Sequence, residues 1–357
     1  MTTSPSPATP DAKPFKVGFI GAGGISGAHA TWYKKIPGVE LVAAADISEK
    51  SLATMKEKWG VKTYTDYKEM LAKEKDLDAV SVCTPNGLHA QNSIDALNAG
   101  KHVIVEKPMA MNAKEGQLMI DAAKKAKKHL VVGFQYRFDG KTAVIKRQID
   151  DGVFGKILYV RCQALRRRGI PNWGVFGRKD LQGGGPMIDI GVHVMEMAHY
   201  TMGSPKPITA SGNVWTYLGN KPMEALTGWA NWDHKTYTVE DLAIGQIRFD
   251  NGALLSIEAS FAAHIEKDMF TFTVMGEKGG ACWDPCAIYK DEHGYMFNET
   301  PHYIGGGDQW EHKMRHFVEV CRDGKPNLSS GEAGLMVQKM LDGVYASAEA
   351  KKEVRID

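Results

Sequence analysis

The chain has 357 residues, enough for two domains, and its 44 Lys and Arg residues balance 42 Asp and Glu residues. This balance argues against a nucleic-acid or membrane-surface partner and leaves a small-molecule ligand open. The five cysteines form no CxxC pair and do not resemble a disulfide framework, so we expect a reducing, cytoplasmic setting.

The first segment, residues 1–13, is rich in Thr, Ser and Pro and lacks the apolar core of a signal peptide. We expect it to be a loose tail. No apolar run approaches the roughly 18 residues that cross a bilayer, so we expect a soluble protein.

The first predicted strand, residues 15–20, runs directly into a glycine turn and an apolar helix. This is the order of a Rossmann dinucleotide-binding unit, in which the first glycine permits the turn and the second lets backbone N–H groups approach a pyrophosphate. A serine replaces the third glycine of G-x-G-x-x-G and is small enough for the same packing. A glycine pattern alone is weak evidence. The candidate cofactor contacts of this turn are Gly21, Gly23, Gly24, Ile25 and Ser26.

A second predicted strand, residues 39–45, ends in Asp46. A carboxylate at this point of a Rossmann unit accepts hydrogen bonds from the adenosine ribose and repels a 2′-phosphate. The alternative is that Asp46 only caps the helix that follows. We favour cofactor binding, with NAD preferred to NADP, although Lys50 could accommodate a phosphate.

Helical and strand-like segments continue to alternate, which predicts a parallel sheet of five or six strands that is complete near residue 139. The loop after the predicted strand 78–83 lies beside the expected nicotinamide. Its histidine could equally be a residue that packs on the loop. The candidate cofactor contacts in this region are Thr84, Pro85, Asn86 and His89.

A short β-branched run within residues 99–109 predicts a buried strand that ends in Glu106, Lys107 and Pro108. Ligands bind at the carboxyl ends of parallel strands, so Lys107 is a candidate for chemistry and Glu106 for cofactor contact. A solvated charged pair at a strand end is the commoner situation, and these residues alone favour it.

From residue 156 the pattern changes to long strands separated by hairpin turns, of which Asn251-Gly252 is the strongest signal. We predict a large, mainly antiparallel open sheet, with helices on one face and either water or a second subunit on the other. The predicted strands are 157–168, 208–217, 239–249, 253–261 and 268–275, followed by helices at 309–321 and 331–350.

A glycine segment, residues 183–185, predicts a flexible entry into a helix that carries Asp189 and His193. On a helix, a spacing of four residues places both side chains on one face, so the carboxylate could orient the imidazole. A surface hydrogen bond or a metal-ligand pair would use the same spacing. No third metal-type ligand is clearly placed beside them, so we predict no metal.

These motifs together resemble the Gfo/Idh/MocA oxidoreductase family, named for glucose-fructose oxidoreductase and inositol dehydrogenase. The resemblance implies an α/β protein with a Rossmann domain over 14–139 and an α/β substrate-binding and oligomerisation domain over 140–357. It implies redox chemistry with a nicotinamide cofactor on a sugar, glycoside or cyclitol, and a homodimer or homotetramer formed through the second sheet. The catalytic group that it implies is Lys107, Asp189 and His193; Glu196 departs from the Asp of many relatives.

An arginine-rich segment that precedes the glycine segment is expected to line the same cleft. A Trp face suits the apolar side of a sugar ring, and arginine suits hydroxyl or anionic groups. In an alternating strand Arg166 and Arg168 share a face, but a solvated basic strand end is an equal alternative. The candidate substrate contacts are Lys107, Arg137, Arg166, Arg168, Trp173, Asp189 and His193.

In alcohol oxidation a base takes the hydroxyl proton as hydride leaves, and His193 has the intrinsic pKa for this work near neutrality. Asp189 would hold His193, and Lys107 would oppose negative charge on the substrate oxygen. The roles of Lys107 and His193 could be exchanged. Two other functions stay open: an NAD-dependent glycosidase that oxidises a sugar transiently, and a non-catalytic regulator that binds sugar or NAD.

Overall fold

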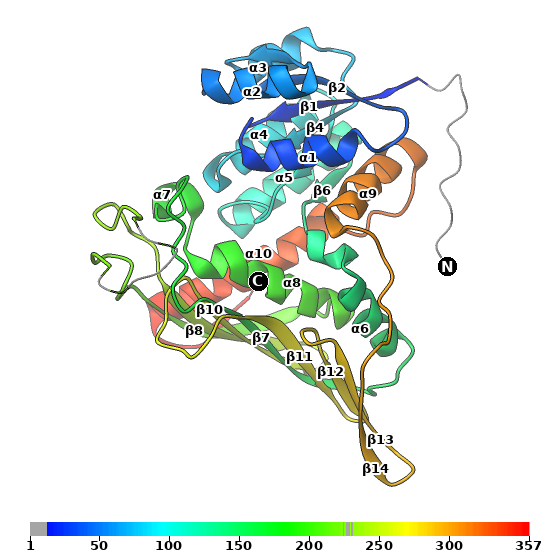
Figure 1. The fold of residues 1–357 in the computed structure, drawn as a ribbon, viewed down its shortest axis with the longest axis vertical. Helices are drawn as coiled ribbons and strands as arrows, with labels where there is room; N and C mark the ends of the chain where they lie inside the picture. The colour runs from blue at the N-terminus through cyan, green and yellow to red at the C-terminus, as the bar shows by residue number, and fades with distance from the viewer. Residues whose placement is uncertain (1–12, 224, 226–228, 230, 357) are drawn as a thin grey trace.

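The computed structural model describes residues 13–223, 225, 229 and 231–356 (Figure 1). The predicted tail, residues 1–13, therefore lies outside the described residues except for its last residue. Among the helices that the structure describes, none combines the length and the apolar character that a membrane span requires.

The first half of the chain alternates strands and helices. Its strands are β1 (Phe15–Ile20), β2 (Val39–Ala45), β3 (Lys62–Tyr64), β4 (Ala79–Val82), β5 (His102–Val105) and β6 (Leu130–Val132). Its helices are α1 (Gly24–Tyr33), α2 (Glu49–Trp59), α3 (Tyr67–Lys73), α4 (Asn86–Asn98) and α5 (Ala113–Ala126).

These six described strands form one parallel sheet in the order β3-β2-β1-β4-β5-β6. This is the order of a doubly wound dinucleotide-binding fold, in which the direction of winding reverses between β1 and β4. Nearly every residue of β1, β4 and β5 is buried, as a sheet covered on both faces requires. The predicted Rossmann unit is confirmed, with β3 as the sixth strand.

After β6, η1 (Gln135–Phe138) leads out of the first half, and the second half begins with α6 (Gly140–Asp150). Its strands are β7 (Ile157–Leu165), β8 (Pro207–Trp215), β9 (Leu242–Phe249), β10 (Leu254–Ser260), β11 (Met269–Gly276), β12 (Gly279–Cys282), β13 (Ala287–Glu292), β14 (Tyr295–Glu299) and β15 (Val354–Arg355). Its helical segments are α7 (Lys179–Gln182), η2 (Met187–Gly191), α8 (Val192–Thr201), α9 (Gln309–Asp323) and α10 (Gly331–Ala350).

The nine strands described in this half form a single sheet in the order β14-β13-β12-β11-β7-β10-β9-β8-β15. Its neighbours are antiparallel except for β7 and β10, which run parallel. Helices α6, α8 and α10 cover the face that looks toward the first half, and the opposite face is open (Figure 1). The predicted large, mainly antiparallel open sheet is confirmed.

Helix α9 joins the two halves, because it returns from the second sheet to pack on the first. Met314 and Phe317 are fully buried in the cluster that contains β1 and α1 residues. The ring of Phe317 meets Phe15 edge-on, with centroids 6.5 Å apart. The last quarter of the chain therefore completes the core of the nucleotide-binding half.

Candidate active site

The glycine turn between β1 and α1 fits the pyrophosphate of a dinucleotide. Gly21 has φ +92°, and a Cβ on it would lie 2.7 Å from the Cys83 backbone, so only glycine fits. A Cβ on Gly23 or Gly24 would meet nothing within 4 Å, so the outer side of the turn is open. Helix α1 starts there with no side-chain cap and no acidic residue in its first turn, which leaves backbone N–H donors for an anion.

Ser26 shapes this turn from inside. Its side chain is buried, and its hydroxyl donates to the Gly23 carbonyl oxygen at 2.6 Å. The predicted contribution of Ser26 to the cofactor site is therefore through the shape of the turn.

Asp46 lies beside the turn, at the end of β2. Its Oδ2 accepts from the Ala22 N–H at 2.7 Å and its Oδ1 from the Ser48 N–H at 2.8 Å. The side chain that caps α2 is Ser48, so the alternative of Asp46 as the helix cap is wrong. The next residue, Ile47, is 93% exposed and supplies no positive charge for a 2′-phosphate, a feature that the sequence reasoning missed.

The loop after β4 is fixed by hydrogen bonds on both sides. Helix α4 begins at Asn86, again without a side-chain cap, and the Asn86 amide donates to the Gln182 carbonyl oxygen at 3.0 Å. The buried His89 ring lies between the carbonyl oxygens of Pro108 and Thr84, at 2.8 and 2.9 Å. This geometry favours a structural role for His89, which ties the loop after β4 to the loop after β5.

Lys107 and Asp189 meet across the two halves of the molecule. The Lys107 Nζ donates to Asp189 Oδ1 at 3.0 Å and to the Asp189 carbonyl oxygen at 2.8 Å. The Lys107–Pro108 peptide is cis. The expected contact of Asp189 with His193 is corrected by this pairing: η2 is a π-helical turn, wider than an α-helical turn, so a spacing of four residues does not stack the two side chains.

His193 is buried at the start of α8, in an apolar environment. Its ring packs edge-on against Tyr136 at 5.1 Å between centroids and lies 6.4 Å from Phe270. Burial, with the positive charge of Lys107 as the next cause, holds the pKa of His193 well below its usual value. The imidazole is therefore neutral near pH 7.

Tight packing, and not flexibility, explains the glycines before η2. A Cβ on Gly184 would clash with the Tyr345 hydroxyl, and a Cβ on Gly185 would clash with the Glu240 carbonyl oxygen. The Glu240 carboxylate holds the turn from the other side, by accepting from the Met187 N–H and the Tyr345 hydroxyl. The predicted flexible entry is thus corrected to a rigid one that fixes Asp189.

A cavity of about 530 Å³ opens in front of Asp189 and His193. Arg166 and Trp173 line it as predicted. The residues of this cavity that the sequence reasoning did not select are Phe176, Asp268, Met269 and Phe270, with Ala164, Leu165 and Ile190. Neither Asp268 nor Phe270 belongs to a recognisable sequence motif. Both lie at the start of β11, which borders the cavity.

Three predicted substrate contacts do not line this cavity: Lys107, which contacts its lining residue Asp189, and the two arginines Arg137 and Arg168. Strand β7 ends at Leu165, so the alternation invoked for Arg166 and Arg168 does not apply, and Arg168 donates to the Arg167 and Ala263 carbonyl oxygens. Arg137 is buried, with an ion pair to Glu196 and a hydrogen bond to the Leu328 carbonyl oxygen. The Arg137–Glu196 pair therefore supports α8 from behind, which also accounts for Glu196.

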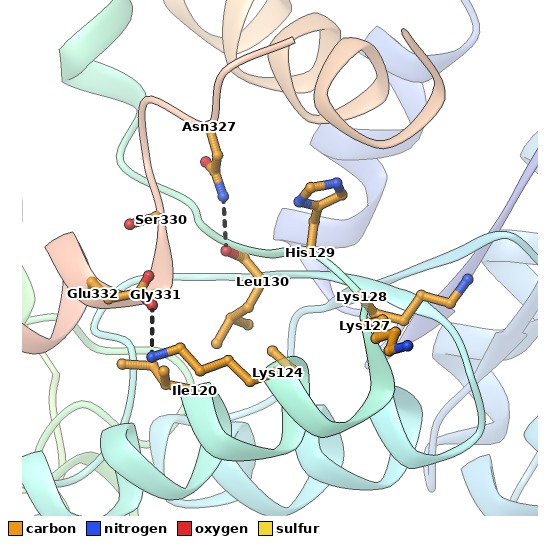
Figure 2. Close-up of a pocket in the computed structure, with 11 residues that line it drawn as sticks. Ile120, Lys124, Lys127, Lys128, His129, Leu130, Asn327, Ser330, Gly331 and Glu332 are labelled. Carbon is orange, nitrogen blue, oxygen red and sulfur yellow. Dashed lines mark hydrogen bonds and ion pairs between the residues drawn. The ribbon is translucent and has the colours of Figure 1, made fainter. Parts of the chain in front are cut away.

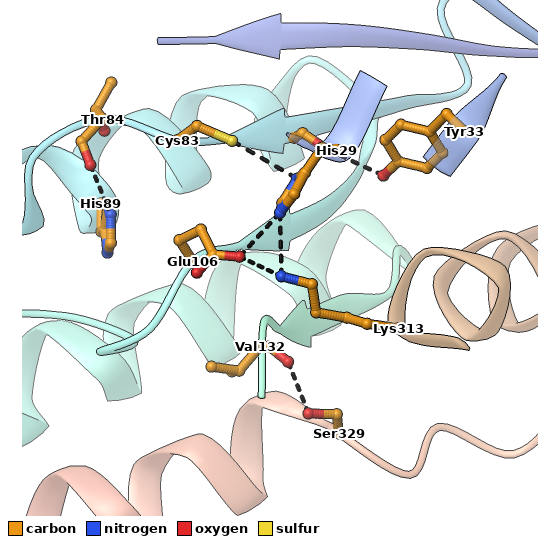
Figure 3. A network of polar contacts seen from close by, with 10 residues as sticks. His29, Tyr33, Cys83, Thr84, His89, Glu106, Val132, Lys313 and Ser329 are labelled. Carbon is orange, nitrogen blue, oxygen red and sulfur yellow. Dashed lines mark hydrogen bonds and ion pairs between the residues drawn. The ribbon is translucent and has the colours of Figure 1, made fainter. Parts of the chain in front are cut away.

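Behind Lys107, the residue Glu106 belongs to a buried polar network (Figure 3). Its Oε1 accepts from Lys313 Nζ of α9 at 2.5 Å and contacts His29 Nε2 of α1 at 2.9 Å. Burial by itself raises the pKa of Glu106, but Lys313 and His29 together hold it below its usual value. Glu106 is thus an ion-pair partner in the interior, in addition to the cofactor contact predicted for it.

A second cavity, of about 290 Å³, lies between the end of α5 and the start of α10 (Figure 2). Its rim carries Lys124, which pairs with Glu332 at 3.3 Å. The predicted site residues do not line it. In the part of the chain that the structure describes, no group of three or more His, Cys, Asp or Glu residues could hold a metal ion.

Comparison with known proteins agrees with this geometry in both halves. A family model described as an oxidoreductase family with an NAD-binding Rossmann fold matches residues 15–134, and the model of an oxidoreductase C-terminal alpha/beta domain matches residues 146–356.

Among curated relatives, D-glucoside 3-dehydrogenase of Escherichia coli (strain K12) is 36% identical over 97% of this chain and 98% of its own. Myo-inositol 2-dehydrogenase of Thermotoga maritima is 30% identical over 96% of this chain and 98% of its own. A solved structure of levoglucosan dehydrogenase in complex with NADH has a TM-score of 0.84 at 25% identity, and the match covers 97% of this chain and 100% of that chain.

Proposed function

The chain belongs to the Gfo/Idh/MocA oxidoreductase family. From this premise we propose that Lys107, Asp189 and His193 catalyse the oxidation of a sugar, glycoside or cyclitol at a ring hydroxyl, with hydride transfer to NAD. One observation supports these residues most directly: the lysine at the end of β5 binds Asp189 at the cavity that His193 lines. The full-length similarity to D-glucoside 3-dehydrogenase makes a glycoside the first substrate to test.

The glycine turn, the first turn of α1 and Asp46 would hold the cofactor, and bound NAD supplies the hydride acceptor. On the protein side, the neutral His193 imidazole accepts the hydroxyl proton of the substrate. Lys107 donates a hydrogen bond to the same oxygen and opposes its developing negative charge. Asp189 orients the Lys107 ammonium through the hydrogen bond that it accepts.

Replacing Lys107 with Met or His193 with Asn tests this assignment. Each variant should lose about 10²- to 10⁴-fold in NAD reduction, the usual range for general acid–base groups. NADH binding, measured by fluorescence, should stay near the wild-type value. Full turnover in either variant would exclude that residue from the catalytic group.

The substrate can be identified by measuring NAD and NADP reduction with a panel of sugars, glycosides, sugar acids and inositols, and by identifying each product. NADH that accumulates together with a ketosugar is the expected result. Release of an aglycone without NADH would instead indicate a glycosidase, and binding without turnover would indicate a regulator.

We also propose that the open face of the second sheet forms a homodimer or homotetramer interface. Trp215, Ile244 and Met275 are exposed large apolar side chains at strand positions that alternate with the helix-covered ones. Ile244→Glu places a charge in the proposed interface, so the mass of the oligomer measured by light scattering should fall toward that of the monomer. A mass that stays unchanged, or a monomeric wild type, would argue against this interface.

We propose a cytoplasmic location, since all five cysteines are free thiols and such thiols persist in a reducing compartment. We likewise propose a division of the chain near residue 139, between η1 and α6. Cell fractionation tests the location, and limited proteolysis tests the division.

A further inference from the structure

Besides Asp189 and His193, the cavity has an aromatic wall that contains Trp173 and Phe176. The loop after β7 brings Trp173 and Phe176 to the cavity, and Trp173 is 55% exposed. More than half of the surface of this residue is therefore still open to a ligand in the concave site.

The rings on this wall hold one another in place. The centroids of Trp173 and Trp229 are 5.3 Å apart with an interplanar angle of 36°, and Phe176 meets Trp173 nearly edge-on at 6.1 Å. The Arg166 guanidinium lies 5.0 Å from the Trp229 ring and donates to the Gly169 carbonyl oxygen at 2.9 Å. The indole face is therefore supported before any ligand arrives, which lowers the entropy cost of stacking.

Polar groups beside the rings indicate what kind of ring would bind. Arg166 lines the cavity, and so does Asp268, whose Oδ1 accepts from the Arg167 N–H at 2.7 Å. An apolar face flanked by a guanidinium and a carboxylate matches a saccharide or glycoside, which presents a flat C–H face and hydroxyl groups at its edge.

The size of the cavity agrees with more than one ring. Its volume of about 530 Å³ falls within the roughly 300–1,000 Å³ of sites that bind drug-sized ligands. All the residues that line it come from η1 or from the second half of the chain.

We propose that Trp173, supported by Phe176 and Trp229, forms a second subsite that stacks on the ring attached to the anomeric carbon of the oxidised sugar. The preferred substrates are then glycosides with a ring as the aglycone, in place of free monosaccharides. This inference rests on the proposed function and specifies its substrate class.

The test compares glucose, methyl glucosides, phenyl glucosides and a glucose disaccharide, in both anomeric forms, as substrates of the full-length enzyme with NAD. Trp173→Ala should lower kcat/KM about 2- to 10-fold for the phenyl glucoside and the disaccharide, the range expected from one aromatic contact. The loss for glucose and methyl glucoside should be smaller, so the ratio of kcat/KM for phenyl glucoside to kcat/KM for glucose should fall. Calorimetric titration with a phenyl glucoside supplies a binding readout that does not depend on turnover.

Tyr303→Ala is the matched control, because Tyr303 is an exposed aromatic residue that does not line the cavity. An equal loss for all four substrates in Trp173→Ala, or equal kcat/KM of the wild type for glucose and phenyl glucosides, would overturn the second subsite. Absence of turnover with every substrate would instead overturn the proposed function. A loss confined to the disaccharide would identify the aglycone ring as a sugar, and a loss confined to phenyl glucosides as an aromatic ring.

Discussion

At the scale of single residues, the spacing of Asp189 and His193 predicted that these two side chains contact each other, but the structure gives them different partners. Asp189 binds Lys107, and His193 stands among Tyr136 and Phe270. In the proposed mechanism the carboxylate orients the Lys107 ammonium, while the apolar surroundings keep the imidazole neutral. The sequence identified these three residues, but which of them touch depended on a π-helical turn.

The pH dependence of oxidation should reflect the environment of His193. Because burial lowers its pKa, the neutral base persists below pH 6.5, and initial-rate kcat/KM should stay nearly flat from pH 8 to pH 6. An unperturbed histidine would lose about fourfold by pH 6. Phe270→Asn admits water beside the His193 ring, so the pH at which kcat/KM begins to fall on the acidic side should move up toward 6.5. A fall of kcat/KM centred at pH 6.5 in the wild type would contradict a buried His193 as the base.

At the scale of elements, two features lie at the carboxyl end of the first sheet: the uncapped N-terminus of α1 and the interior ion pair of Glu106 with Lys313. The sequence identified the first of these features but not the second. The glycine turn was recognisable because it lies between a predicted strand and a predicted helix, and because the second predicted strand ends in Asp46. The partner of Glu106 was not, because Lys313 is 207 residues away and lies on an ordinary amphipathic helix.

Gly23→Ala should separate folding from cofactor binding. A Cβ at Gly23 meets nothing within 4 Å, so the free energy of unfolding should change by less than about 1 kcal/mol. The Kd for NADH should rise about tenfold or more, since each 1.4 kcal/mol of lost backbone contact is a factor of ten. Gly27→Ala, equally open but one turn into α1, is the control, and an equal effect on its Kd would refute this interpretation.

Lys313→Met should destabilise the protein by about 3–5 kcal/mol in urea unfolding, because it leaves the buried Glu106 carboxylate without its cation. Adding Glu106→Gln should recover part of this loss. Lys325→Met is the matched control: its pair with Glu319 is 53% exposed on the lysine side, and its loss should cost less than about 1 kcal/mol. Equal costs for the two lysines would argue against an interior role for Lys313.

The second sheet shows where prediction of elements stops. The strands from β7 to β11 were predicted within a few residues because apolar and polar side chains alternate. Strands β12, β13, β14 and β15 were missed. Strand β12 is a four-residue GGAC segment, β15 has two residues, and β14 is exposed along its whole length, so it has no buried face to leave a pattern.

At the scale of the whole molecule, burial of neutral histidines in several places couples stability to pH. His29 and His199 are both buried, and burial lowers the pKa of each to about 4. In the unfolded chain they take up protons near pH 6.5, so their contribution to stability is present above that pH and is lost as the pH falls toward 4.

Urea unfolding at pH 7 and pH 5 should therefore show a loss on the order of 2 kcal/mol for each of these histidines, before most carboxylates titrate. In His199→Gln the loss between the two pH values should shrink, because one titrating group is gone. An equal change between the two pH values in the wild type and in His199→Gln would contradict the burial of a neutral His199.

The sequence by itself determined the Rossmann unit with its glycine turn, the long strands of the second sheet, the resemblance to the family and the three candidate catalytic residues. These follow from local rules: strand and helix periodicity, glycine at positive φ, and short motifs at fixed spacing. Only the tertiary structure decided that Asp189 binds Lys107, that Arg137 turns inward to Glu196, and that α9 closes the first core. These contacts join residues 59 or more positions apart, and their energies depend on burial, which no local pattern records.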